Sequence, residues 1–443
     1  MGNKPLAFIA VATAAITMLS GCSSSASPSQ SAPLDALQQL IQQAEGMTNQ
    51  QLFEKAIEES NGKTMYGIGN TSRGATAATS FIAELQTINP NYTGKIDWSQ
   101  PKNNSIFTTL SADINSQQHT YSITLIQDGN QIQSKMLNTG YLYNFIPKQW
   151  RDAAGVSIEK DGNPLALETV TKVFMFNNLN PAVSYNNMWS YVAQGNKPMF
   201  MDVNSEPVGK NFLYMLTADP YAKWVKAAFD KLPANQQSYF QQTVESVAGD
   251  VQLLGLTSAD AKYALAWIKL WLQQYNAQTD DGPICNDLVT TSASGESALL
   301  VYSKLRSIEE SATASVKNVT IAAFEDGWAG VGGFGYKIYE MIPKTSPMPW
   351  TAMAFIAYMA TTTDGFAAWG KDMGSYSANP TINQDHTKDG WVDDVNTFPS
   401  KNDPGMAWWT SETGGRLVIE DPAYASKTAQ LMSDWVDVIR GGQ

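Results

Sequence analysis

The stretch 385–396 has the spacing of a calcium-binding loop. Side-chain oxygens occupy its positions 1, 3, 5 and 9, with Gly390 at position 6 and an aliphatic residue at position 8. Hard cations prefer such a set of oxygens around a sharp turn. Position 12 is Asn396 instead of a bidentate glutamate, so binding would be weak. The pattern predicts a structural calcium site, or else a solvated acidic turn. The calcium ligands would be Asp385, Thr387, Asp389 and Asp393. We expect no other cofactor.

Patterns typical of enzymes are weak in this chain. Gly330–Gly335 matches G-x-G-x-x-G, but a dinucleotide site needs a helix after the glycines and an acid about 20 residues further on. A predicted strand, Tyr336–Tyr339, follows instead, and no acid occurs between Met341 and Thr363. Cys285 would need a neighbouring base to act as a nucleophile, and we expect it to be a small buried residue. We therefore predict that the protein is not an enzyme.

Composition limits the class of partner. The 443 residues carry a formal net charge of −12, and only 16% are charged, against about 25% in a typical soluble domain. Nucleic-acid binding requires clustered Lys and Arg, so it is excluded. The chain is long for a single hydrophobic core, and we expect two folded parts.

The N-terminus has the layout of a secretory signal. Lys4 precedes an uncharged apolar run that is too short to span a bilayer, and small residues follow it. The ending Leu19-Ser20-Gly21-Cys22 resembles the lipobox of bacterial lipoproteins. That resemblance implies a signal peptide over 1–21, lipidation of Cys22 and attachment to the outer face of a cell membrane or to a periplasmic leaflet. The small polar residues 22–33 predict a flexible linker.

Strand and helix patterns alternate along the first part of the chain. Apolar residues at helical spacing predict helices over 75–88 and 104–114. Predicted strands lie at 63–69, 95–98 and 121–126. Such alternation indicates a mostly parallel sheet of the α/β class, which binds ligands at the carboxyl ends of its strands. A later region, about 230–314, is rich in helix, and we expect Trp267, Leu270, Trp271 and Tyr275 to pack in its core.

The order of these segments resembles substrate-binding proteins of ATP-driven (ABC) importers, in the branch that handles iron, phosphorylated sugars and related solutes. The segments that carry the resemblance are the strand and polar loop 65–74, the strand ending at 127–128, the strands 173–177 and 197–202, the helix start at 186–189, and the helical stretch 346–365. The resemblance implies a two-lobed periplasmic-binding-protein-like fold (type II-like), with a mixed sheet and flanking helices in each lobe and crossover strands between them. Lobe 1 would comprise 34–175 with 336–443, and lobe 2 would comprise 176–335 with a helical insertion near 230–314.

The same resemblance implies a function. A small polar solute, such as a sugar or sugar phosphate, would bind between the lobes of a monomer and be delivered to an ABC permease in the membrane. Iron is not favoured, because the chain lacks the adjacent tyrosines of ferric-binding members. Loops at strand ends would supply polar contacts and aromatic residues flat faces. The ligand-binding residues would be Asn70, Thr71, Ser72, Arg73, Asp128, Asn187, Trp189, Trp328 and Tyr336.

Within this set, Arg73 could clamp a phosphate or carboxylate, or could simply be an exposed arginine at a helix start. Two other classes of protein stay open. One is a lipid-anchored extracellular hydrolase acting on glycans, which would need two carboxylates placed about 5 to 10 Å apart. The other is an adhesive lipoprotein, which needs no closing cleft.

Overall fold

The computed structural model describes residues 34–101, 105–116, 118–180, 185–290, 295–302, 318–373, 375–383 and 404–441. The expected signal peptide, Cys22, the linker and the calcium ligands Asp385, Thr387, Asp389 and Asp393 lie outside these residues. Ala36–Gln443 forms one compact unit. Among the described residues, no helix is both long and apolar enough to cross a membrane.

A mixed sheet runs through the described part of the chain, with main strand order β2-β1-β3-β10-β5-β8-β6-β7. The strands β2, β1 and β3 are parallel to one another, and so are β8, β6 and β7. Between these two groups, β10 is antiparallel to β3 and β5, and β5 is antiparallel to β8. This arrangement confirms the predicted α/β class. The strands are β1 Thr64–Gly69, β2 Lys95–Ser99, β3 Tyr121–Gln127, β5 Ala166–Asn177, β6 Met199–Met201, β7 Asn276–Gln278, β8 Ser297–Val301 and β10 Gly333–Pro343. Four short strands pair with β5 or β10: β4 Leu142–Tyr143, β9 Val319–Ile321, β11 Tyr376–Ser377 and β12 Leu417–Ile419.

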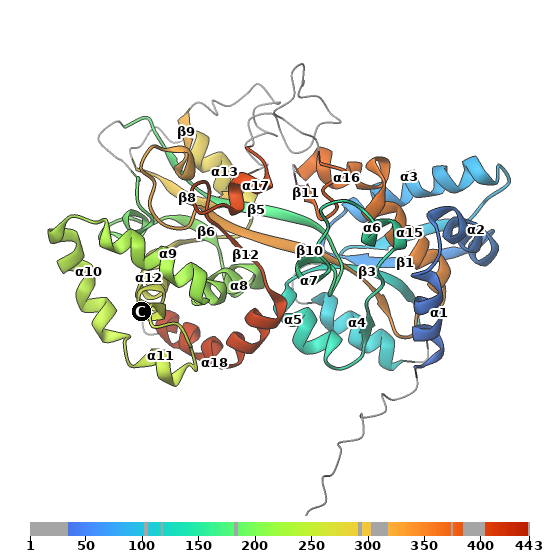
Figure 1. Cartoon of the computed structure of the whole chain (residues 1–443), viewed down its shortest axis with the longest axis horizontal. Coiled ribbons are helices and arrows are strands. Elements are labelled where there is room, and N and C mark those ends of the chain that lie inside the picture. Colours follow the sequence, from blue (N-terminus) through green and yellow to red (C-terminus); the bar gives the residue numbers. More distant parts are fainter. Residues whose placement is uncertain are drawn as a thin grey trace, which may run out of the picture. The chain divides into compact units, whose positions relative to one another are not determined.

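The long strands β5 and β10 connect two hydrophobic cores. They pair side by side from Gly333 with Val173 to Tyr339 with Ala166, and every residue in both strands is buried (Figure 1). The first half of β10 contributes Phe334 to one core, and its second half contributes Met341 to the other. β5 and β10 are therefore the two crossover strands that the sequence predicted.

The first core lies between β1, β2 and β3 and the helices that pack on them. Its central helix, α15, is buried along most of its length, from Thr351 to Ala360. The Glu59 carboxylate accepts hydrogen bonds from the backbone N–H and the hydroxyl of Thr351, both at 2.7 Å, and so satisfies free donors at the start of α15. The helices of this part are α1 Ala36–Ala44, α2 Asn49–Ser60, α3 Arg73–Ile88, α4 Ser105–Asn115, α15 Pro349–Thr361 and α16 Thr363–Met373.

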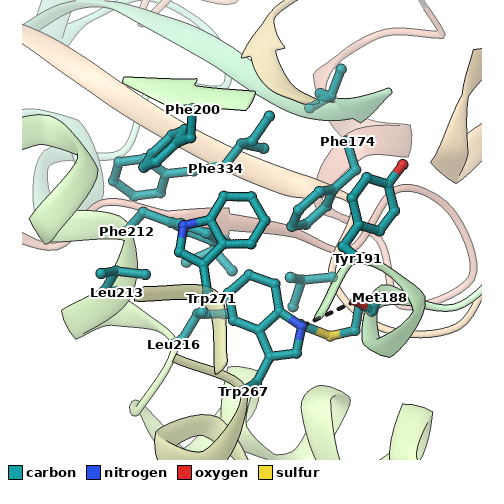
Figure 2. Close-up of a cluster of buried hydrophobic side chains, with 14 of the residues drawn as sticks. Phe174, Met188, Tyr191, Phe200, Phe212, Leu213, Leu216, Trp267, Trp271 and Phe334 are labelled. Atoms are coloured by element: carbon teal, nitrogen blue, oxygen red, sulfur yellow. Dashed lines mark hydrogen bonds between the residues drawn. The ribbon is translucent and has the colours of Figure 1, made fainter. Parts of the chain in front are cut away.

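The second core is built around aromatic side chains. Trp267 and Trp271, one turn apart on α12, stack with ring centroids 5.0 Å apart and are fully buried among Phe174, Phe200 and Phe212 (Figure 2). The core positions predicted for these two tryptophans are thus confirmed. The helices of this part are α8 Pro207–Met215, α9 Asp219–Asp230, α10 Ala234–Ser246, α11 Asp250–Leu253, α12 Ala261–Gln274, α13 Asp281–Thr290, α17 Met406–Thr410 and α18 Pro422–Gly441.

The C-terminal segment packs differently from the expectation that placed 336–443 in lobe 1. Trp409, Val418 and Met432 belong to the second core, together with residues of the expected lobe 2, 176–335. The cause is the position of β12, which pairs in parallel with Gly333–Gly335, the part of β10 that lies in the second core. The chain therefore returns to the second core after completing the first.

Short helical segments complete the described structure. The π-helix η1, Ile132–Leu137, extends α5 directly after the end of β3, and the 3-10 helix η2, Met188–Val192, follows β5. The side chain of Asn187 caps η2 by accepting a hydrogen bond from the backbone N–H of Trp189. The others are α5 Gly129–Gln131, α6 Lys148–Arg151, α7 Ile158–Asp161 and η4 Ala322–Phe324.

Candidate binding site at the crossover strands

The loop after β1, residues 70–73, is held at the carboxyl ends of β1 and β3. Asn70 Oδ1 accepts a hydrogen bond of 3.0 Å from the backbone N–H of Gln127, the last residue of β3. Trp98 Nε1 donates to the Thr71 carbonyl at 2.9 Å, and the Trp98 ring occupies the space where Gly74 would carry a side chain. The expected ligand loop is thus fixed at the edge of the sheet where α/β folds bind ligands.

Two buried glutamates lie beside each other on one face of β5 and β10. Glu168 is paired across the strands with Ile338, two residues before Glu340, and its charge acts on Glu340. Both side chains are fully buried, and no carboxylate oxygen of either has a hydrogen-bond partner among the described residues. The Ser375 hydroxyl lies beside Glu168 without reaching hydrogen-bond geometry.

Burial controls the protonation of this pair. It raises the pKa of Glu168 from 4.5 to about 8, against the smaller lowering effects of Ser375 and Arg73. Burial, followed by the nearby charge of Glu168, raises the pKa of Glu340 well above its usual range. Loss of hydration disfavours the ionised form of a carboxyl group that no donor compensates. Both acids therefore hold a proton more tightly than an exposed glutamate does.

A buried ion cluster continues along the same face of β5. Lys172 Nζ lies 3.3 Å from Glu206 Oε2 and 3.2 Å from Asp281 Oδ2, and it is 5.9 Å from the ring centroid of Tyr336. Burial alone would lower the pKa of Lys172, but the two carboxylates outweigh it and raise that pKa. Glu206 precedes α8 and Asp281 begins α13, so both follow the carboxyl ends of strands, β6 and β7 respectively. The second core thus also presents charged groups at its strand ends.

A third polar network joins the end of β3 to α8 and to the end of β12. Asn211 Nδ2 on α8 donates to Asp128 Oδ1 at 2.8 Å and to Glu420 Oε1 at 2.9 Å. Tyr339 donates its hydroxyl to Glu420 Oε2 at 3.1 Å. Burial, and then the charge of Asp128, raises the pKa of Glu420 to about 7. Burial also raises the pKa of Asp128, although Asn211 and Gln131 oppose this rise through hydrogen bonds.

The structure does not gather all the predicted ligand-binding residues at one surface. Ser72 is exposed, and Asn70, Thr71 and Arg73 are half-buried. Asp128 belongs to the network with Asn211, and Tyr336 is buried beside Lys172. The remaining three are also buried, so they pack in this conformation: Asn187, Trp189 and Trp328.

Several functional candidates were missed from the sequence. Glu168, Lys172 and Glu340, like Lys337, are charged residues inside mostly apolar strands. In a sheet covered on both faces, a charge at such a position is expected to be buried, and this signal could have identified all three. Among the described residues, no group of three or more His, Cys, Asp or Glu side chains is placed to hold a metal ion. Cys285 is buried, as expected.

Comparison with known proteins identifies the fold. No protein-family model and no curated protein sequence matches the chain. Among solved structures, iron-bound HitA from Pseudomonas aeruginosa has a TM-score of 0.55 at 11% identity, over 85% of this chain and 99% of that one. MotA from A. tumefaciens B6, in complex with glucopine, has a TM-score of 0.52 at 13% identity, over 85% and 99%. An ABC transporter substrate-binding protein from Bradyrhizobium japonicum has a TM-score of 0.50 at 13% identity, again over 85% and 99%. The chain therefore has the two-lobed α/β fold of the periplasmic, type II-like substrate-binding proteins, as its segment order predicted.

Proposed function

We propose that this protein is the substrate-binding component of an ABC importer, that it captures a small polar solute and that it catalyses no reaction. The observation that carries the proposal is the fold, which matches substrate-binding proteins over 85% of the chain and nearly the whole length of theirs. Two cores joined by β5 and β10 supply the parts that such a function needs.

The mechanism follows from this arrangement. A solute that contacts both cores binds one arrangement of them more tightly than another, and so shifts the equilibrium between open and closed forms. The loop 70–73 would contribute polar contacts at the strand ends of the first core, where Asn70 Oδ1 holds it by accepting from the Gln127 N–H. The closed form would dock on a membrane permease. Lipidation of Cys22 would keep the protein at the outer face of the membrane, within reach of that permease.

The ligands of the matched structures do not identify the cargo of this protein. HitA was solved with iron and MotA with glucopine. In this chain there is no adjacent pair of tyrosines, and the described residues contain no group placed to hold a metal. These observations give no support to iron and leave an organic solute as the proposed cargo.

A thermal-shift screen tests the proposal. The purified protein is heated with sugars, sugar phosphates, polyamines, ferric chelates and calcium, and a ligand that binds the folded form raises the melting temperature. We expect a saturable rise with one class of organic solute, accompanied by a smaller radius of gyration in solution scattering. If no solute raises the melting temperature and a soluble glycan is hydrolysed instead, the importer function is wrong and the hydrolase alternative is supported.

A further inference from the structure

The pair Glu168 and Glu340 lacks partners that a folded protein normally supplies. More than nine in ten buried polar groups accept or donate a hydrogen bond. Here four carboxylate oxygens in two adjacent side chains have none among the described residues. A structural ion cluster would look different, as the cluster at Lys172 shows, where one ammonium group serves both acids. The glutamate pair therefore has no hydrogen-bond donor among the described residues, and its four carboxylate oxygens are available to the donors of a ligand.

The pair lies where the fold places a ligand. Glu340 is opposite Leu125 in β3, and Leu125 in turn is paired with Gly69, the last residue of β1. Glu168 is opposite Ile338, which pairs with Gln127 at the end of β3. Both glutamates are thus level with the carboxyl ends of two parallel strands, directly before the loop 70–73.

Neighbouring cations compensate the pair only weakly. The charge of Arg73, in that loop, lowers the pKa of Glu168, but this effect is smaller than the rise caused by burial. Glu340 experiences only burial and the charge of Glu168. Further along the same face, Lys172 is already shared between Glu206 and Asp281. Lys172 is therefore not available to the glutamate pair, and a bound cationic group would compensate the two carboxylates when they ionise.

We propose that the solute carries a protonated amine or guanidine, and that Glu168 and Glu340 accept its N–H donors. This inference rests on the proposed function and names the chemical class of its cargo. Hydrogen bonds between a cationic nitrogen and a carboxylate are about twice as strong as neutral ones, and they strengthen further when water is excluded. Arg73, at the rim of the pair, disfavours cations that reach only the loop and leaves room for an acidic group on the same solute.

Binding of a cation has a consequence for protons. The pair holds protons in the unliganded protein because ionised carboxylates are poorly compensated there. A cationic nitrogen compensates them, so each acid that ionises on binding releases one proton to the buffer. A neutral sugar would give no such release.

Isothermal titration calorimetry with matched probes tests the inference. Putrescine is compared with 1,4-butanediol, and glucosamine with glucose, so that each pair differs in its amines alone. Titrations at pH 7.5 in two buffers of different ionisation enthalpy count the protons released. The variants are Glu168→Gln and Glu340→Gln, with Glu245→Gln, an exposed acid on α10, as the matched control. Calcium chloride serves as a metal-cation probe.

We expect at least one amine to bind with net proton release while its alcohol counterpart does not. Glu168→Gln and Glu340→Gln should each weaken that binding by at least about tenfold, the loss expected for a hydrogen bond to a charged group. Glu245→Gln should leave it unchanged. Because the comparison of amine with alcohol uses the unaltered protein, it decides the question even if a variant fails to fold.

Three results would overturn the inference. If glucose or 1,4-butanediol binds and no amine does, the importer function stands but the cargo class is wrong. If calcium binds at the pair and amines do not compete, the site takes a metal cation. If no solute binds at all, both the inference and the proposed function fail.

Discussion

At the scale of single residues, the described structure concentrates its chemistry in buried acids. Glu168, Glu340, Asp128 and Glu420 all have pKa values raised mainly by burial. In the last two, hydrogen bonds from Asn211 compensate part of the cost, whereas the first two have no such partner. The two pairs should therefore respond differently to pH and to substitution.

The stability of the protein should fall as pH rises from 5 to 8. The folded-state pKa of Glu168, about 8, exceeds its ordinary value of 4.5, so the folded protein binds this proton more tightly than the unfolded chain. The resulting stabilisation is complete below pH 4.5 and is lost as pH rises through about 8. Glu168→Gln should lose less unfolding free energy between pH 5 and pH 8 than the unaltered protein does, and the difference should be at most about 4 kcal/mol.

Urea denaturation at pH 5 and pH 8 measures this effect. The exposed control Glu245→Gln should keep the pH dependence of the unaltered protein. If the free energy of unfolding depends equally on pH in Glu168→Gln and in the unaltered protein, the pKa of Glu168 is not raised in the folded state.

Asn211→Ala should destabilise the protein by about 2–3 kcal/mol, because it leaves two buried acids, Asp128 and Glu420, without their shared amide donor. Asn211→Asp should cost more at pH 8 than at pH 5, since it adds a third carboxyl group to the network. Chemical denaturation checks both variants. The exposed Asn204→Ala should change the free energy of unfolding by less than about 0.5 kcal/mol, and a similar result for Asn211→Ala would contradict the role given to this network.

The sequence predicted part of the candidate site. It indicated the loop 70–73 and Asp128 because polar residues after a strand are a local pattern, and the structure joins them through Asn70 and Gln127. It missed Glu168 and Glu340, which lie inside strands and not after them. Their charge indicated burial, but that they lie side by side depends on the pairing of β5 with β10, two strands far apart in sequence. It also selected Trp189 for a ligand site, although this indole packs in the core and donates to the Val225 carbonyl.

At the scale of elements, local patterns predicted most of the first core. The expected strand 63–69 and helix 104–114 correspond to β1 and α4 within one residue. The helix expected over 75–88 is α3, which begins at Arg73, two residues earlier than expected. The packing of α18 was not predictable in the same way, because a late helix can cover either core and only the pairing of β12 with β10 decides which.

Helix α12 is the element on which the second core most depends. Trp267→Ala should lower the free energy of unfolding by about 3–5 kcal/mol, because the surrounding aromatic rings cannot fill the cavity. Trp267→Phe should cost less, losing mainly the hydrogen bond from Nε1 to the Met188 carbonyl. Denaturant unfolding measures both variants. Trp224→Ala, at a half-buried position on α9, is the matched control, and equal costs for Trp224→Ala and Trp267→Ala would contradict this ranking.

At the scale of the whole molecule, the two cores share their central strands. β5 and β10 are buried throughout and contribute side chains to both cores. Neither core can lose its structure without exposing part of a strand that the other core needs. The two cores are therefore expected to unfold together.

Urea unfolding followed by far-ultraviolet circular dichroism and by tryptophan fluorescence should give coincident single transitions. Helix content and tryptophan fluorescence both report on the two cores, because Trp150 and Trp369 are buried in the first core and Trp267 and Trp271 in the second. Two separated transitions would show that the crossover strands do not couple the cores. Gly333→Ala should shift both probes together, because an added Cβ would lie 2.1 Å from the Lys172 carbonyl oxygen and disturb the pairing of β10 with β5.

The stacked indoles of Trp267 and Trp271 also give the protein an intrinsic optical signature. Their planes are 19° apart, and their centroids are close enough for the electronic transitions of the two rings to couple. Coupled chromophores in a fixed chiral arrangement produce an exciton couplet of paired positive and negative bands. The spectrum should lose this couplet when either ring is replaced. It would thus read out the geometry of α12 in solution without any added label.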